Sequence, residues 1–281
     1  SDLYAFIYAR TDYFVVINIL LLLISTKLST LFTGNPLTQL PEAIAAISFS
    51  FFSTTATLSF ITLRRISSTG FAITVFFVII MLPLGITQNE IIGRILQIGF
   101  YIPLISVLLF FWRNKVSNKS SKLLIDFILL LCAATNPVVL AICFLYLLQD
   151  LSRDWSFLAC FKRTFSLALP FTIFLACLLP RIGGKGGIPG EFNSHNLIET
   201  IIARPVIYPF IFPWYQHLSN ITSIALMIAI TILIWLSYRK TDNAESKWLI
   251  LFSAITLLIY DLASIVMRPG LTDLLSNYQT T

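Results

Sequence analysis

The chain has 281 residues, of which 57% are hydrophobic and 11% are charged, and its formal net charge is +6. A soluble globular domain carries roughly 25% charged residues, so this composition excludes a water-soluble protein with a charged surface. The positive charge predicts basic cytoplasmic loops rather than a nucleic-acid partner, because no basic patch is interleaved with aromatic residues.

Apolar runs of membrane-spanning length recur along the chain. A helix needs about 20 such residues to cross a hydrocarbon core of about 30 Å. We therefore predict an all-α, polytopic transmembrane helical bundle with about seven full spans and one proline-broken pair of short helices. These form a single transmembrane domain over residues 1–281. In chain order the predicted segments are 13–32, 41–62, 71–84, 87–112, 123–148, 164–180, 221–238 and 248–267.

Two of the early segments carry local signals. The second is rich in Ser, Thr and Ala, which lets neighbouring helices approach and hydrogen-bond, and Arg64 and Arg65 end it. Thr87 and Glu90 have the spacing of a capping box. We expect the helix that they open to run to about Trp112.

The segment 123–148 contains the sequence Thr135-Asn136-Pro137, which divides it into two short helices. Either it forms one kinked span, or it is a re-entrant hairpin with both ends on one side. The hairpin gathers more of the Lys and Arg residues on one side of the membrane, so the positive-inside rule favours it. For Asp126 we expect local pairing with Lys122, four positions earlier. Residues 150–163 are expected to form a cytoplasmic connector at the membrane surface.

Residues 181–218 form the longest interval without a clean span, and in the hairpin topology they are a non-cytoplasmic loop. Five glycines around Lys185 offer amides that could cradle an anion, although a flexible loop explains them as well. Residues 196–204 have the pattern of a short interfacial helix. The aromatic residues among the prolines after this helix fit either a headgroup-level belt or a surface on which a lipid or sugar ring stacks.

Titratable residues in and beyond this loop supply the candidate chemistry. His195 and His217 have no third ligand at metal spacing, so we predict no metal site, and either histidine could act in hydrogen bonding or acid–base work. Asp261 lies inside the last span, where an acid is a functional hypothesis by default, although pairing with Arg268 is equally compatible. The four cysteines show no metal or redox spacing.

The many spans, the short helices meeting at Thr135-Asn136-Pro137, and the outward loop rich in Gly, Pro and aromatics resemble bacterial inner-membrane GT-C glycosyltransferases and related surface-polysaccharide proteins. The resemblance rests on organisation. It implies an all-helical membrane fold and a catalytic acid in the first outward loop. Residues 33–40 here contain no acid, and Glu42 follows them.

From these features we expect a membrane-embedded glycosyltransferase-like enzyme that uses a polyprenyl-phosphate-linked sugar in cell-surface polysaccharide or glycolipid assembly. Cations would neutralise the leaving phosphate, and a carboxylate would activate the acceptor hydroxyl. The candidate catalytic residues are Glu191, Glu42 and Asp261, and the candidate substrate-binding residues are Arg181, Lys185, His195, Arg204, His217 and Arg268.

Two other functions stay open. A transporter or flippase for a lipid-linked substrate would use the half-helix ends at Asn136 as its binding site. A non-catalytic membrane assembly subunit is the third alternative. We predict no cofactor, expect membrane lipid as a partner, and place the protein in the bacterial inner membrane. Because the sequence starts without Met and stops in a polar stretch, we expect it to be part of a longer protein.

Overall fold

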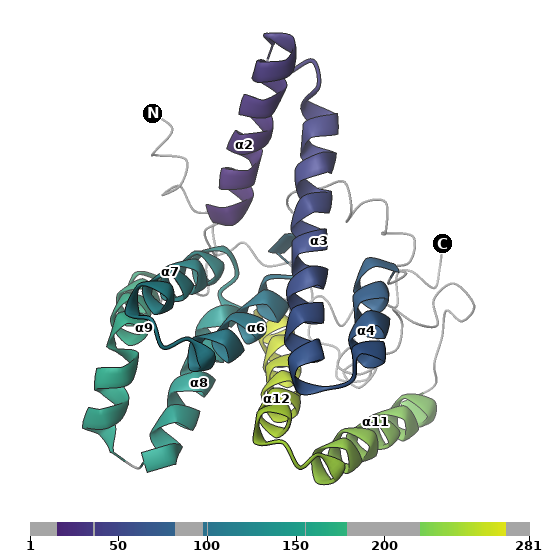
Figure 1. The fold of residues 1–281 in the computed structure, drawn as a ribbon, viewed down its shortest axis with the longest axis vertical. Helices are drawn as coiled ribbons and strands as arrows, with labels where there is room; N and C mark the ends of the chain where they lie inside the picture. Colours follow the sequence, from purple (N-terminus) through teal and green to yellow (C-terminus); the bar gives the residue numbers. More distant parts are fainter. Residues whose placement is uncertain are drawn as a thin grey trace. The chain divides into compact units, whose positions relative to one another are not determined.

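The computed structural model describes residues 16–35, 37–81, 98–99, 101–154, 156–178 and 220–267, and within these ranges the regular structure is helical. Figure 1 shows the helices in chain order. They are α2 (Val16–Thr33), α3 (Leu40–Ile66), α4 (Thr69–Met81), α6 (Ile102–Lys115), α7 (Lys119–Thr135), α8 (Val138–Asp154), α9 (Phe157–Leu178), α11 (Asn220–Lys240) and α12 (Ala244–Met267).

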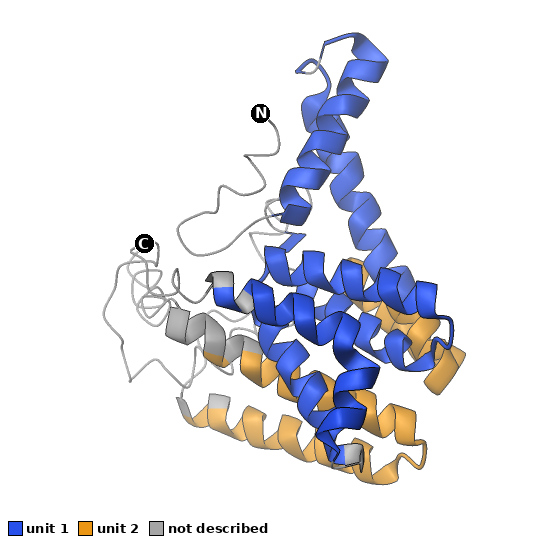
Figure 2. Ribbon diagram, turned by 90° about the vertical axis from the view of Figure 1, so that its left-hand side faces the viewer, with its two compact units in different colours: residues 1–58, 89–184 blue, residues 59–88, 185–281 orange. Residues whose placement is uncertain are grey.

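The chain divides into two compact units, coloured separately in Figure 2. Unit 1 comprises residues 1–58 and 89–184, and holds α2, most of α3, and α6 to α9. Unit 2 comprises residues 59–88 and 185–281, and holds the end of α3 with α4, α11 and α12. Helices α6 to α9 pack on one another in unit 1, and α11 packs on α12 in unit 2.

Three helices in the described part of the chain are long and apolar enough to cross a membrane: α2, α3 and residues 157–174 of α9. This confirms an all-helical membrane protein at the level of fold class. The other predicted spans are helices too, but the length and composition of their described residues do not identify them as full crossings.

The burial pattern of α2 is inverted relative to that of a water-soluble helix. Its buried side chains are the polar Asn18, Ser25 and Ser29, while Leu22 and Ile24 are exposed. Lipid accepts exposed apolar side chains at no cost, whereas polar groups must find partners inside the protein. The hydroxyl of Ser29 does so at the turn after α2, where it donates to the carbonyl of Asn35 at 3.2 Å. The pattern therefore matches a lipid-facing helix.

The predicted segments agree with the observed helices in position, with two corrections in unit 1. The helix predicted to run from Thr87 to Trp112 begins instead at Ile102, with Tyr101 at its N-cap position and Pro103 in its first turn. Proline is well tolerated there because the first amides of a helix have no partner within it. The predicted capping box lies outside the described residues.

The second correction concerns the connector expected at residues 150–163. Helix α8 continues to Asp154 and α9 begins at Phe157, so most of this segment is helical. The polar residues at the end of α8 do not end it, because Asp150 is neutralised by Arg163 of α9. Helix α9 also runs through Pro170, near the middle of its 22 residues.

The predicted break at Asn136 and Pro137 is confirmed, since α7 ends at Thr135 and α8 begins at Val138. The side chain of Asn136 fixes the break on both sides. Its Oδ1 accepts from the Val138 amide at 3.1 Å, and its Nδ2 donates to the carbonyl of Gly99 at 3.1 Å. The start of α2 joins here as well, because the amide of Ile17 donates to Oγ1 of Thr135 at 2.9 Å.

Replacing Asn136 with alanine is expected to lower the free energy of unfolding by about 1–2 kcal/mol, the upper part of the range for losing a cap. The matched control is Asn118→Ala, because Asn118 caps α7 through a bond from the Ser120 amide at 3.0 Å and is exposed. Unfolding in detergent micelles by titration with sodium dodecyl sulfate, followed by circular dichroism, measures both. Equal losses would mean that the bond to Gly99 contributes nothing.

Candidate functional site

Among the described residues of unit 1, charged side chains cluster where the last turn of α6 packs against α7. Arg113, in the last turn of α6, binds the carboxylate of Asp126 through two bonds, Nε to Oδ1 at 2.6 Å and Nη2 to Oδ2 at 3.2 Å. Both side chains are almost fully buried, with exposures of 5% and 3%. Such a two-pronged pair combines charge with fixed geometry.

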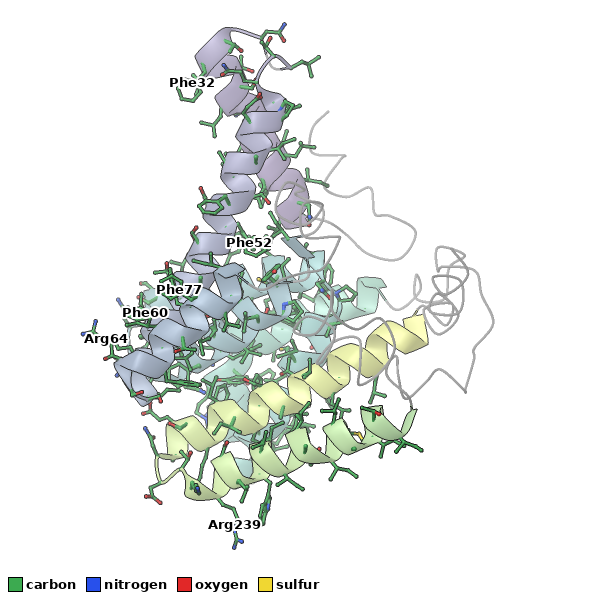
Figure 3. All side chains as sticks on the ribbon, turned by 90° about the vertical axis from the view of Figure 1, so that its right-hand side faces the viewer. Phe32, Phe52, Phe60, Arg64, Phe77 and Arg239 are labelled. Atoms are coloured by element: carbon green, nitrogen blue, oxygen red, sulfur yellow. The ribbon has the colours of Figure 1, made fainter. Side chains whose placement is uncertain are left out.

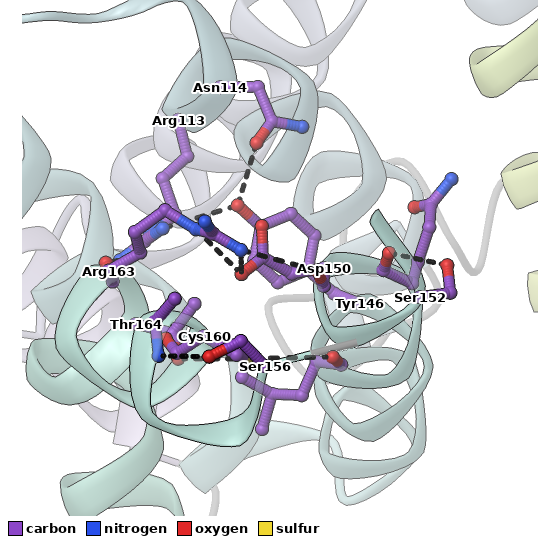
Figure 4. Close-up of polar contacts among 12 residues, drawn as sticks. Arg113, Asn114, Tyr146, Asp150, Ser152, Ser156, Cys160, Arg163 and Thr164 are labelled. Atoms are coloured by element: carbon purple, nitrogen blue, oxygen red, sulfur yellow. Dashed lines mark hydrogen bonds and ion pairs between the residues drawn. The ribbon is translucent and has the colours of Figure 1, made fainter. Parts of the chain in front are cut away.

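Helices α8 and α9 complete the surroundings of Arg113. Its Nη1 donates to the hydroxyl of Tyr146 on α8 at 3.2 Å, and its Nη2 donates to the carbonyl of Arg163 on α9 at 3.3 Å. The Tyr146 hydroxyl in turn donates to Oδ1 of Asn114 at 2.7 Å, and its ring stacks on Phe110 with centroids 4.6 Å apart. Figure 4 shows Arg113, Asn114, Tyr146 and Arg163 converging from three helices.

A second ion pair lies beside the first. Arg163 donates to Oδ2 of Asp150 from Nε at 3.1 Å and from Nη2 at 3.0 Å, which joins α9 to the last turns of α8. Asp150 is 8% exposed and Arg163 42% exposed, so this pair is partly hydrated and contributes less than the buried one.

The buried pair is built to hold helices together rather than to move a proton. Burial disfavours the charge on Arg113, which lies outside the three candidate spans, but the bonds and charges of Asp126 and Tyr146 outweigh that effect and raise its pKa. Both oxygens of Asp126 accept from Arg113, and Oδ2 also accepts from the Ser166 hydroxyl of α9 at 2.5 Å. Both oxygens of this carboxylate are thus already engaged by donors within the protein. We therefore assign the cluster a structural role.

The bonds of this cluster show the relative direction of α7 and α8. Asp126 on α7 and Tyr146 on α8 are twenty positions apart, which in a straight helix would separate them by about 30 Å. Both bind the same guanidinium, so α7 and α8 fold back on each other. The end of α6 also touches α9 across the same cluster. This is the geometry of the hairpin alternative rather than that of a single kinked span.

The expected pairing of Asp126 with Lys122 is wrong, because Asp126 is bound by Arg113 and Ser166 instead. An acid on an apolar helix needs a buried partner, and the lysine one turn earlier lies nearer the helix start. The signal that sequence reasoning missed was the arginine that ends the preceding helix, thirteen positions before the acid.

Two of the nine predicted site residues fall within described helices. Glu42 is exposed in the first turn of α3. Asp261 lies within α12, as predicted, but the position of its side chain is not described. The other predicted residues lie outside the described ranges, and their roles stay predictions. They are Arg181, Lys185, Glu191, His195, Arg204, His217 and Arg268.

Within the described ranges, no three His, Cys, Asp or Glu side chains are grouped closely enough to hold a metal ion. Three cysteines there, Cys132, Cys143 and Cys160, are buried free thiols. Cys160 joins the packing of α8 on α9, since its Sγ lies 3.8 Å from the carbonyl of Leu147. These thiols therefore serve as small core residues.

Comparison of the chain with protein-family models, with curated proteins and with solved structures finds no match.

Proposed function

We propose that the protein is a multi-pass glycosyltransferase-like enzyme of the bacterial inner membrane that transfers a sugar from a polyprenyl-phosphate carrier during surface polysaccharide or glycolipid assembly. One observation carries the proposal: the folded-back pair α7–α8, held by Arg113. With this hairpin, the ends of α6 and α8 and the start of α9 share one side. Helix α9, about 33 Å long, then leads to the opposite side, where the loop 181–218 follows.

In this proposal the loop and the last span bind the donor from the non-cytoplasmic side. The positive side chains neutralise the phosphate that leaves with the polyprenyl chain, which is the largest electrostatic demand of the reaction. A carboxylate takes the proton of the acceptor hydroxyl, and the histidines hydrogen-bond the sugar. The donor-site residues are Arg181, Lys185, Arg204 and Arg268, the candidate bases are Glu191, Glu42 and Asp261, and the histidines are His195 and His217.

The position of Glu42 supports this arrangement. It lies in the first turn of α3, whereas Arg64 lies in the last turn of the same helix, about 33 Å away along the axis. Glu42 is therefore at the end of α3 opposite its arginines. If those arginines face the cytoplasm, Glu42 faces the compartment that we propose for the loop.

The transporter alternative is less well supported. It requires the polar groups at the helix break to be available to a substrate at mid-membrane. The side-chain oxygen and nitrogen of Asn136 both hydrogen-bond backbone groups, Val138 and Gly99, so they serve the fold of unit 1. This observation favours the enzyme over the transporter.

The test is a transfer assay with isolated membranes and a labelled polyprenyl-linked sugar. Arg204→Ala and Arg268→Ala are each expected to reduce turnover at least about 100-fold, the scale of removing one group that stabilises transition-state charge, without lowering the amount of protein in the membrane. Lys119→Ala serves as the control, because Lys119 is an exposed cation at the start of α7. Normal turnover in both arginine variants would remove the donor-site assignment.

A further inference from the structure

One end of unit 2 gathers cations from three helix termini. The hydroxyl of Ser246, in the first turn of α12, donates to the carbonyl of Ile66 at the end of α3 at 3.1 Å. Only three residues separate the end of α11 at Lys240 from the start of α12 at Ala244. The end of α3, the end of α11 and the start of α12 therefore meet. Figure 3 labels Arg64 near the end of α3 and Arg239 near the end of α11, where their side chains point outward on different sides.

We call this region the basic end, and define it as Arg64, Arg65, Arg239, Lys240 and Lys247. The first four are exposed and Lys247 is half-buried. The acids of the same segments are Asp242 and Glu245, so basic side chains outnumber acidic ones by five to two. The region thus keeps a net positive charge.

Aromatic side chains accompany these cations. The guanidinium of Arg239 lies 4.8 Å from the ring centre of Trp235, and Nζ of Lys247 lies 5.6 Å from that of Tyr238. Trp235 is 52% exposed and Tyr238 is 38% exposed. Rings and cations with these exposures are the anchors that proteins place at the level of lipid headgroups.

The apolar surface next to the basic end indicates which anion it meets. Ile232, Leu233 and Leu236 are exposed on α11, within two turns of Arg239. A helix with this surface faces acyl chains, so the cations at its end lie at the depth of the adjoining phosphates. A site for a soluble polyanion would not need exposed apolar side chains beside its cations.

We propose that the basic end binds the phosphate groups of anionic phospholipids in the leaflet that surrounds it. Each cation near an anionic membrane surface adds a modest increment, and several together discriminate anionic from zwitterionic headgroups. The occupant is lipid and not a free anion, because the site joins charged and apolar surface on one helix.

The experiment uses the purified full chain in detergent and counts bound lipid by native mass spectrometry. The probe is phosphatidylglycerol, compared with phosphatidylcholine. Arg239→Gln combined with Lys240→Gln is expected to weaken phosphatidylglycerol binding about tenfold and to leave phosphatidylcholine binding unchanged. The matched control, Lys119→Gln with Lys122→Gln, removes the same charge from α7 in unit 1 and is expected to bind like the wild type.

A double variant that conserves both charges is the control for misfolding. Arg239→Lys with Lys240→Arg keeps both charges and is expected to keep the affinity for phosphatidylglycerol. The proposal is overturned if the Gln pair and the control lose affinity equally, or if neither loses any. Competition by millimolar inorganic phosphate as effective as that by lipid would also overturn it, because it would identify a site for a soluble anion.

Discussion

Replacing Asp126 with alanine is expected to lower the free energy of unfolding by about 3–5 kcal/mol, because the substitution leaves the guanidinium of Arg113 buried without its counter-charge. The hydroxyls of Ser166 and Tyr146 cannot supply a negative charge in its place. Titration of the micelle-bound protein with sodium dodecyl sulfate, followed by circular dichroism, measures the loss.

Two further variants test whether the loss of stability comes from leaving Arg113 without its counter-charge or from removing the side-chain atoms of Asp126. Asp150→Ala breaks the neighbouring pair, whose arginine is 42% exposed and stays hydrated, so it is expected to cost at most about 1 kcal/mol. Arg113→Met combined with Asp126→Leu removes both buried charges and is expected to recover most of the stability lost in Asp126→Ala. If Asp126→Ala and Asp150→Ala cost the same, Arg113 is not held as described.

Cysteine labelling in intact cells is expected to give an almost all-or-none result. Ser117 precedes α7 and Ser152 lies near the end of α8, so cysteines at these positions share one side of the hairpin and are protected from an impermeant maleimide. Ser194→Cys, in the loop proposed to face outward, is expected to be labelled. The background keeps the buried Cys132, Cys143 and Cys160 and replaces Cys177 with serine.

Permeabilised cells provide the control, because all three introduced cysteines are expected to react once the reagent reaches both faces. Labelling of Ser152→Cys but not of Ser117→Cys in intact cells would contradict the hairpin. It would mean that residues 123–148 cross the membrane, and it would move the loop 181–218 to the cytoplasmic face.

Much of the helical framework could be predicted from local pattern. The break at Asn136 and Pro137 has a local cause, since proline cannot continue the hydrogen bonding of α7 and asparagine caps the start of α8. Helices α11 and α12 were predicted to within a few residues because apolar runs bounded by charged turns specify them. Boundaries failed where tertiary contacts changed the role of polar residues, as at Asp150.

The charge cluster could not be predicted in the same way. Arg113 and Asp126 are on different helices, and pairing them requires knowing that α6 and α7 pack together. Lys122, one turn before Asp126, is a local partner that can be proposed without knowing how the helices pack. The hairpin itself was favoured only by the statistics of positive charge, whereas the structure supplies contacts: Arg113 binds both Asp126 of α7 and Tyr146 of α8.

Pro170 interrupts the backbone hydrogen bonding of α9 next to the charge cluster. Proline has no amide hydrogen, so the carbonyl of Ser166, four residues earlier, lacks its usual intrahelical donor. Ser166 is also the residue whose hydroxyl reaches Asp126. The turn of α9 that holds the carboxylate therefore has one hydrogen bond fewer to the next turn of the helix. Helices bend most often at proline, so this turn is where the backbone of α9 is least constrained, and it lies next to the bond between Ser166 and Asp126.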